Sequence, residues 1–127
     1  MPNRRAGGDG AVTMTNLRIG IHTSRARSLE YAALKAHELG ANTFQIFSAS
    51  PRMWRASVPD PTDIAAMRRV RERCDLYPLV IHVNYLVNLA TLDPVIREKS
   101  VVSFRGELDR AAAIGADYLV VHPGNYR

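Results

Sequence analysis

Four short hydrophobic runs along the chain have the length and composition of β-strands. They cover residues 17–22, 43–47, 79–82 and 118–122, and they are rich in β-branched and aromatic side chains. Three longer segments between these runs place hydrophobic residues at helical spacing instead. The pattern therefore predicts strands that alternate with helices.

Each helical segment starts at a residue that caps helices well. Ser28, Asp60 and Asp93 hold the capping positions, and a proline follows each aspartate at the first helical position. Gly40 and Gly115 can adopt the left-handed conformation that ends a helix. The residues expected on the buried faces are Leu29, Ala33, Ala36 and Leu39 in the first helix, Ile64, Met67, Arg71 and Cys74 in the second, and Ile96, Ser100, Phe104, Leu108 and Ala111 in the third.

This alternation predicts an α/β fold of parallel (β/α) units, with about four strands and three helices. Short αβ joints and longer βα loops are typical of a parallel sheet with right-handed crossovers. An internal similarity supports the assignment. Leu-Gly-Ala-Asn-Thr-Phe at 39–44 and Ile-Gly-Ala-Asp-Tyr-Leu at 114–119 both join a helix to a strand.

Histidines mark the ends of three of these strands. His22, His82 and His122 end hydrophobic runs, and only His37 of the four histidines lies within a helical segment. The carboxyl ends of parallel strands meet at one edge of the sheet, where (β/α) proteins carry their active sites, so the three imidazoles should gather there. Imidazole binds metal ions and transfers protons. A packed or hydrogen-bonded histidine is the alternative for each residue taken alone.

The segment 48–61 is unusually long for a connection and holds Arg52, Met53, Trp54 and Arg55 in succession. Connections of this length often carry function. Trp54 either anchors the loop by burial or offers a surface for stacking. The arginines of the following helix, Arg68, Arg69, Arg71 and Arg73, are expected mostly to face solvent.

The composition limits the class of protein. The formal net charge is +5, and fifteen of the seventeen basic residues are arginine. Guanidinium groups suit phosphate, so the charge is compatible with nucleic acid, although a solvated arginine-rich surface explains it equally well. The length fits one domain. Cys74, the only cysteine, excludes an internal disulfide and is expected to pack against the core.

The amino-terminal residues lack the hydrophobic segment of a secretory signal. Arg4 and Arg5 are followed by Gly7, Gly8 and Gly10. No run in the chain approaches the roughly 18 apolar residues that cross a bilayer. We therefore expect a flexible tail at 1–16 and a soluble cytoplasmic protein without a membrane partner.

Four motifs together resemble the endonuclease IV family of apurinic/apyrimidinic (AP) endonucleases, within the wider xylose-isomerase-like TIM barrels. They are Gly-Ile-His-Thr-Ser at 20–24, Pro-Arg-Met-Trp at 51–54, His-Val-Asn-Tyr-Leu-Val-Asn-Leu at 82–89 and Val-His-Pro-Gly at 121–124. The motifs occur in the family's order and span nearly everything after residue 16. The motif at 82–89 is the most specific of them.

The resemblance implies a DNA-repair hydrolase that cuts the phosphodiester bond 5′ to an abasic site in double-stranded DNA, with a cluster of three zinc ions. By that analogy His82 and His122 are zinc ligands, and no catalytic residue is required beyond the metal ligands. Arg52, Tyr85 and Leu86 correspond to the residues that enter the DNA at the lesion, where they replace lost stacking.

Three further residues are candidates for support of this site. His22 either contacts a phosphate or the metal shell, or makes an ordinary strand-end hydrogen bond. Trp54 has the two roles already described. Asn84, together with Asn88, can orient its loop through bonds from side chain to backbone.

Several alternatives stay open. The family's remaining ligands come from later strands, and two histidines cannot hold three zinc ions. We therefore expect residues 17–127 to be the amino-terminal half of a barrel, a fragment of a longer reading frame with little activity alone. A half-barrel that pairs with a second copy and an inactive remnant are alternatives. A sugar isomerase or epimerase of the same superfamily, or a non-catalytic DNA-binding fragment, are the other functions to consider, and the oligomeric state is open.

Overall fold

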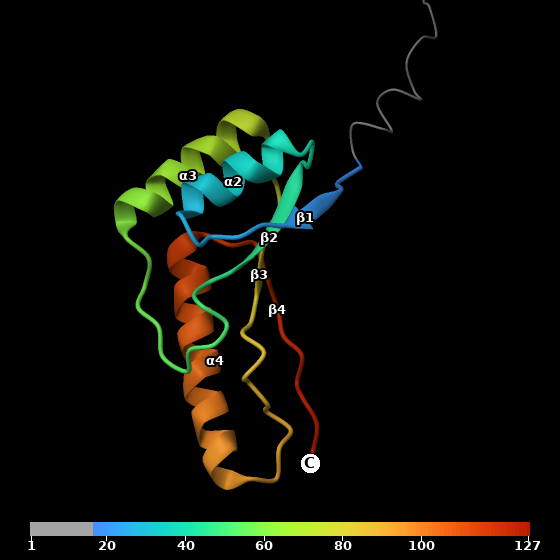
Figure 1. The fold of residues 1–127 in the computed structure, drawn as a ribbon, viewed down its shortest axis with the longest axis vertical. Helices are drawn as coiled ribbons and strands as arrows, with labels where there is room; N and C mark the ends of the chain where they lie inside the picture. The colour runs from blue at the N-terminus through green and yellow to red at the C-terminus, as the bar shows by residue number, and fades with distance from the viewer. Residues whose placement is uncertain (1–16) are drawn as a thin grey trace, which may run out of the picture.

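The computed structural model of the protein describes residues 17–127, so the tail expected at 1–16 lies outside the described residues. The elements are β1 (Gly20–His22), α2 (Leu29–Glu38), β2 (Thr43–Phe47), α3 (Pro61–Cys74), β3 (Leu79–His82), α4 (Pro94–Ile114) and β4 (Tyr118–Val120). The strands form one parallel sheet in the order β1-β2-β3-β4. The helices α2, α3 and α4 lie along one side of it (Figure 1). The expected α/β class is confirmed.

The two faces of the sheet have different neighbours. Along β2 and β3 every second residue is buried, which is the alternation of a strand with one covered face. The side chains turned toward the helices are Phe44, Ile46, Leu79 and Ile81, each at most 1% exposed. The register pairs Phe47 with His82, so these two side chains share the opposite, more open face.

The helices α2 and α3 pack together over the sheet. Ala32, Ala33 and Ala36 are fully buried, and such small side chains allow the helix to lie close to its neighbours. The expectation that Leu39 is also buried is wrong, because Leu39 follows the last helical residue and is 54% exposed. The chain then reverses at Gly40, whose φ of 82° is left-handed as expected.

The packing of α3 follows the sequence pattern with one difference. Ile64 and Met67 are buried, and Cys74 packs half-buried against the core. Arg71 does not face solvent as the rest of its arginine cluster does. Its Nη2 lies 2.7 Å from Asp117 Oδ2, and its side chain is 13% exposed. Arg71 therefore ties α3 to the start of β4.

Two strands are shorter than expected. β1 starts at Gly20 because the Asn42 side chain bonds the preceding backbone. Asn42 Oδ1 accepts from Ile19 N at 2.8 Å, and Asn42 Nδ2 donates to the Leu17 carbonyl at 2.8 Å. β4 ends at Val120 rather than at residue 122, since the chain beyond it turns toward the loop after β3, where Ala90 N donates to the Pro123 carbonyl at 3.0 Å.

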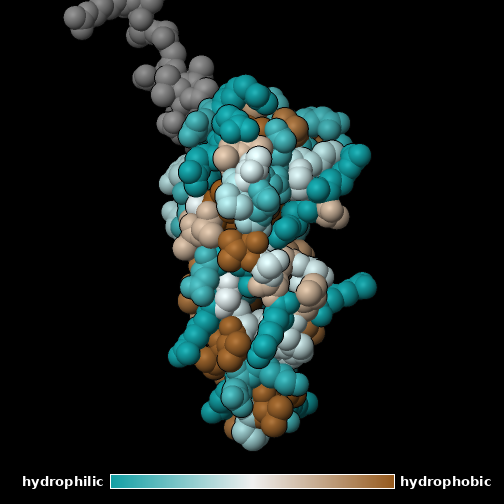
Figure 2. All heavy atoms as spheres, turned by 90° about the vertical axis from the view of Figure 1, so that its left-hand side faces the viewer, coloured by the Kyte–Doolittle hydropathy of each residue, from teal (hydrophilic) through white to brown (hydrophobic). Residues whose placement is uncertain are grey.

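The buried face of α4 differs most from expectation. Ser100 and Ala111 are buried, but Ile96 is 39% and Leu108 47% exposed. The other buried residues of the helix are Ser103, Glu107, Arg110 and Ile114. The inner face is thus largely polar, and hydrophobic side chains remain among hydrophilic ones on the outer surface over α4 (Figure 2). The physical reason is that polar groups of two loops lie beneath this helix.

None of the helices between residues 17 and 127 combines the length and hydrophobicity that a bilayer crossing requires.

Candidate functional site

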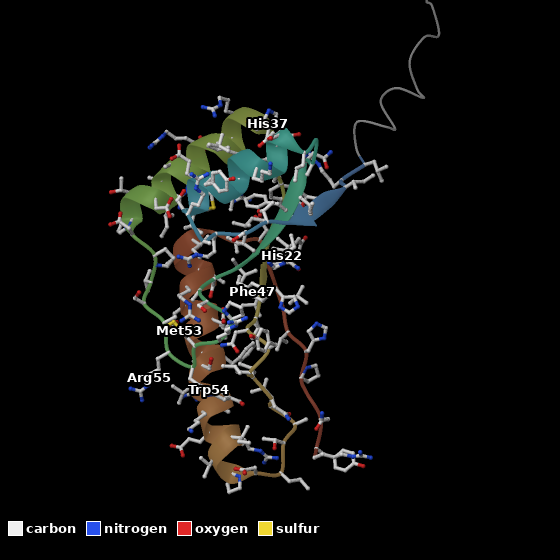
Figure 3. All side chains as sticks on the ribbon, viewed as in Figure 1. His22, His37, Phe47, Met53, Trp54 and Arg55 are labelled. Carbon is white, nitrogen blue, oxygen red and sulfur yellow. The ribbon has the colours of Figure 1, made fainter. Side chains whose placement is uncertain are left out.

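Three imidazoles line the carboxyl-terminal edge of the sheet, and we refer to His22, His82 and His122 as the histidine rim. The ring centroids of His22 and His82 are 6.4 Å apart, and those of His82 and His122 are 5.1 Å apart. The Phe47 ring lies 4.7 Å from His22 and 5.4 Å from His82. The expected gathering of three histidines at one edge is confirmed, whereas His37 lies on α2 away from His22 (Figure 3).

The surroundings of His82 fix its tautomer. Its Nδ1 lies 2.7 Å from the Val83 carbonyl oxygen. A carbonyl oxygen only accepts, so Nδ1 carries a proton and donates it. In the neutral ring Nε2 then keeps a free lone pair. Histidine ligands of metals commonly donate their second nitrogen in this way, so His82 is oriented to bind a metal through Nε2.

His22 has the opposite arrangement. Its Nδ1 accepts a hydrogen bond from Gln45 Nε2 at 2.9 Å, so the neutral ring carries its proton on Nε2. Burial lowers the pKa of His22, and the neighbouring His82 lowers it further. The strand-end hydrogen bond considered from the sequence is therefore present, and Nε2–H is left as a donor for an anionic oxygen.

The described residues supply part of a metal site. His82 and His122 are adjacent at the rim, but zinc normally takes four ligands. Across residues 17–127, no group of three or more His, Cys, Asp and Glu side chains is placed to hold a metal ion. The rim thus fits zinc as two nitrogen ligands of a larger set.

Two exposed loops adjoin the rim. Arg52 lies in the loop that follows β2, and its side chain is exposed. Tyr85 and Leu86 follow β3 three and four residues after His82; Tyr85 is 61% exposed, and Leu86 is half-buried. All three side chains expected to contact DNA therefore belong to loops that leave the same edge of the sheet. Their role in DNA binding stays a prediction.

Asn84 joins these two loops. Its side chain is buried, and Nδ2 donates to the Met53 carbonyl at 3.1 Å and to Ser103 Oγ at 3.2 Å. Its Oδ1 accepts from Leu86 N at 2.8 Å. The side chain thus bonds the backbone of both loops, as its expected orienting role requires.

Asn88 makes the equivalent connection between the loops after β3 and β4. Its backbone N donates to Ser100 Oγ at 2.9 Å, and its Oδ1 accepts from Asn125 N at 3.1 Å. A Cβ on Gly124 would lie 2.2 Å from Asn88 Oδ1, and Gly124 has a φ of 90°. The glycine after His122 and Pro123 is therefore needed for the close approach of the two loops.

Trp54 lies beside α4 and is half-buried. It borders a small cleft with Glu98, Lys99 and Val102 of that helix. Arg55 points away from the helix (Figure 3). This placement suits the expected anchoring of the loop by Trp54.

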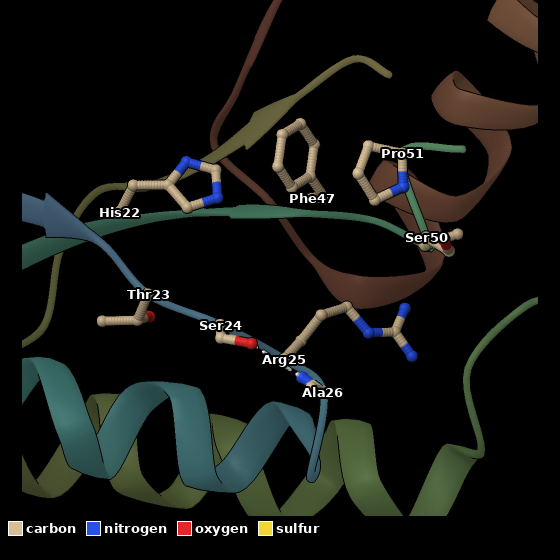
Figure 4. Close-up of a pocket in the computed structure, with 9 residues that line it drawn as sticks. His22, Thr23, Ser24, Arg25, Ala26, Phe47, Ser50 and Pro51 are labelled. Carbon is tan, nitrogen blue, oxygen red and sulfur yellow. Dashed lines mark hydrogen bonds between the residues drawn. The ribbon is translucent and has the colours of Figure 1, made fainter. Parts of the chain in front are cut away.

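A cleft of about 620 Å³ adjoins the rim and brings in a residue that the sequence did not single out. Its lining includes His22, Ser24, Arg25, Phe47, Ser50 and Pro51 (Figure 4). Arg25 donates to the Ser48 carbonyl. Burial lowers the pKa of Arg25, whereas the Asp63 carboxylate raises it and Arg110 lowers it again. The sequence signal that could have found Arg25 is its position in the loop that follows the strand-end histidine His22.

Comparison with known proteins identifies the family. The family model described as "Xylose isomerase-like TIM barrel" matches residues 33–127. The chain belongs to this family. It is similar to the probable endonuclease 4 of Solibacter usitatus. The two sequences are 70% identical over 111 residues, which cover 87% of this chain and 38% of that protein. Endonuclease 4 of Thermus thermophilus is 43% identical over 112 residues, 87% of this chain and 41% of that protein.

A solved structure agrees with this assignment to the xylose isomerase-like TIM barrels. The crystal structure of endonuclease IV from Thermus thermophilus superposes with a TM-score of 0.80 at 42% identity, over 87% of this chain and 42% of that one. The four strands and three helices between residues 17 and 127 thus match part of a TIM barrel. The chain spans about two fifths of the length of these relatives.

Proposed function

We propose that the protein to which these residues belong is a zinc-dependent AP endonuclease of base excision repair, which hydrolyses the phosphodiester 5′ to abasic sites in double-stranded DNA. The observation that carries the proposal is the histidine rim with Arg52 and Tyr85 in adjoining exposed loops. One edge of the sheet thereby combines metal-binding imidazoles with side chains suited to a damaged duplex. The names of the relatives, endonuclease 4 and endonuclease IV, support this assignment.

The residues divide the work by their chemistry. His82, through Nε2, and His122 would hold zinc, which supplies Lewis-acid activation of the phosphate and of water when bound. Burial and the neighbouring His82 lower the pKa of His22, which favours its neutral form, and the Nε2–H of that form can donate to a phosphate oxygen. No side chain of the chain has to act as a nucleophile.

The loops would recognise the lesion. An abasic site lacks one base of the stack, which leaves room for a side chain from the protein. Tyr85 and Leu86 offer a ring and an apolar group to fill that space, and the Arg52 guanidinium can pair with phosphate. The remaining zinc ligands would come from outside residues 17–127, so this chain alone should show little incision.

A chimaera tests the assignment of the metal ligands. Residues 17–127 would replace the matching part of Thermus thermophilus endonuclease IV, whose remaining strands complete the barrel. The chimaera should cut a duplex containing a tetrahydrofuran abasic analogue, lose activity in EDTA and regain it with zinc. His82→Ala and His122→Ala should each lower the incision rate by more than about 100-fold, since even outer-shell changes cost about 10–100-fold. His37→Ala is the matched control and should incise normally.

The loops are tested by DNA affinity in the same chimaera. Arg52→Ala and Tyr85→Ala should each weaken binding to the abasic duplex, and Arg52→Ala should reduce the slope of log affinity against log salt by about one. Arg69→Ala removes an exposed arginine from α3 and should leave the preference for abasic DNA intact. Unchanged affinity in both loop variants would instead favour the sugar isomerase alternative, because a small-sugar site has little use for these loops.

A further inference from the structure

A buried polar network fills the space between α4 and the two loops that carry Arg52 and Tyr85. We call it the clamp network; its members are Ser48, Asn84, Ser103, Glu107 and Arg110, all at most 5% exposed. Every buried side-chain nitrogen and oxygen among the described residues has a hydrogen-bond partner. Buried charges are unfavourable unless they are paired in this way.

Glu107 connects two strand ends through one carboxylate. Its Oε2 accepts a hydrogen bond from the hydroxyl of Ser48, which directly follows β2. Its Oε1 accepts from Asn84 N at 3.3 Å, two residues after the end of β3, and lies 3.3 Å from Arg110 Nη2. Apart from its ion pair with Arg110, the Glu107 carboxylate therefore bonds only to loop residues, Ser48 after β2 and Asn84 after β3.

Arg110 holds the loop after β2 at two points. Its Nε donates to Ser48 Oγ at 2.8 Å, and its Nη1 donates to the Ala56 carbonyl at 3.3 Å. Between these points Asn84 Nδ2 donates to the Met53 carbonyl, one residue after Arg52. The loop is thus fixed on both sides of Arg52 by groups that are also bonded to the loop after β3.

We infer that Glu107 and Arg110 are positioning residues, which fix the Arg52 loop and the Tyr85–Leu86 loop in one relative geometry so that both meet the same lesion. The inference rests on the proposed function for what the loops bind. Neither residue would touch DNA, because both are buried. Holding two contact groups in their bound arrangement before binding reduces the ordering cost of association.

The single tryptophan reports on this role without DNA. Trp54 is the only tryptophan of the chain and lies inside the clamped loop. In the full chain, Glu107→Gln keeps the size of the side chain and removes the negative charge that pairs with Arg110 and accepts the hydrogen bond from Ser48. Trp54 should then show lower fluorescence anisotropy and stronger quenching by acrylamide, while circular dichroism stays that of the folded chain.

Two further variants keep the test decisive. Asp109→Asn makes the same change of charge on an exposed residue of α4 and should leave Trp54 fluorescence unchanged. Ser48→Ala removes only a hydroxyl and replaces Glu107→Gln in the test if that variant fails to fold. It should likewise lower the fluorescence anisotropy of Trp54 and strengthen its quenching by acrylamide. The inference is wrong if Trp54 is as immobile in the folded Glu107→Gln and Ser48→Ala variants as it is in the unmodified chain.

DNA binding separates positioning from a general structural role. With a fluorescein-labelled abasic duplex, Glu107→Gln should weaken binding about tenfold, the size expected when one charged hydrogen bond is lost. In a chain that already carries Arg52→Ala and Tyr85→Ala, the same change should have an effect below about twofold, because the clamped groups are gone. An equal loss in both backgrounds would contradict positioning.

The two proposals can fail separately. If Arg52→Ala and Tyr85→Ala leave binding of the abasic duplex unchanged, the proposed DNA contacts are wrong, while the Trp54 measurement still decides whether Glu107 orders the loop. If the loop variants weaken binding and Glu107→Gln does not, the proposed function stands and the positioning inference is wrong.

Discussion

The ion pair between Glu107 and Arg110 is the most deeply buried charged contact among residues 17–127. The side chains are 2% and 6% exposed, and the closest nitrogen and oxygen are 3.3 Å apart. Such a pair gains little net stability, because desolvation of both charges offsets their attraction. Removal of one partner is far more costly, since the other charge stays buried alone.

Arg110→Met should therefore destabilise the chain by about 3–5 kcal/mol. The double variant Glu107→Gln with Arg110→Met should cost clearly less than the sum of the two single changes, because it leaves no unpaired charge. Urea unfolding followed by circular dichroism gives the free energies. Arg69→Met, at an exposed arginine of α3, is the control and should change stability by no more than about 0.5 kcal/mol. Additive effects in the double variant would show that the pair is not coupled.

Local signals in the sequence were sufficient to find the seven helices and strands that the structure describes between residues 17 and 127. Ser28 Oγ accepts from Tyr31 N at 2.9 Å, and Asp93 Oδ1 accepts from Val95 N at 2.8 Å, as capping residues do. The histidine rim was predictable for a similar reason, because the end of each strand is visible in the hydrophobic pattern and parallel strands end together.

The inner face of α4 could not be predicted from its own pattern. Its hydrophobic periodicity favoured Ile96 and Leu108, which are exposed. Glu107 and Arg110 are buried instead because the carbonyl of Ala56 and the backbone of Asn84 need partners beneath the helix. That requirement arises far away in the sequence, so the clamp network appears only in three dimensions.

The cap of α3 gives a prediction on acid stability. Asp60 Oδ1 accepts from Thr62 N at 2.7 Å, and this backbone hydrogen bond is the main cause that lowers the pKa of Asp60 below its ordinary 3.8. The cap therefore stabilises the fold above that value, and the contribution is lost as the pH falls through the lower folded pKa. Asp60→Asn keeps an acceptor that does not titrate and should show a weaker fall in urea midpoint between pH 4.5 and pH 2.5. If the urea midpoint falls by the same amount in both proteins over this pH range, this account is wrong.

In the assembled sheet, the parallel register brings the two proposed zinc ligands together from different strands. His82 is the register partner of Val120, and His122 follows two residues later, just beyond the end of β4. The two ring centroids are 5.1 Å apart at the carboxyl-terminal edge of the sheet. Neither histidine could contribute to a shared metal site without the β3–β4 pairing.

Zinc affinity of the full chain is the measurement that follows from this arrangement. His82→Ala and His122→Ala should each weaken binding by at least about tenfold, and His37→Ala should not. Binding should also weaken from pH 7.5 to pH 5.5, because only the neutral imidazole is a ligand. Competition with a chromophoric chelator reports both effects. Equal affinity in all three histidine variants would place the metal elsewhere.

The alternation of side chains across the strands also decides from which direction a partner can arrive. Phe47 and His82 point away from the surface that α2, α3 and α4 cover. Under the proposed function, a duplex would therefore reach the rim at the carboxyl-terminal edge of the sheet, and the outer surface of α3, on the covered side, would stay free in the complex. A chain tethered to a sensor chip through Arg69→Cys should accordingly bind DNA as well as the same chain in solution.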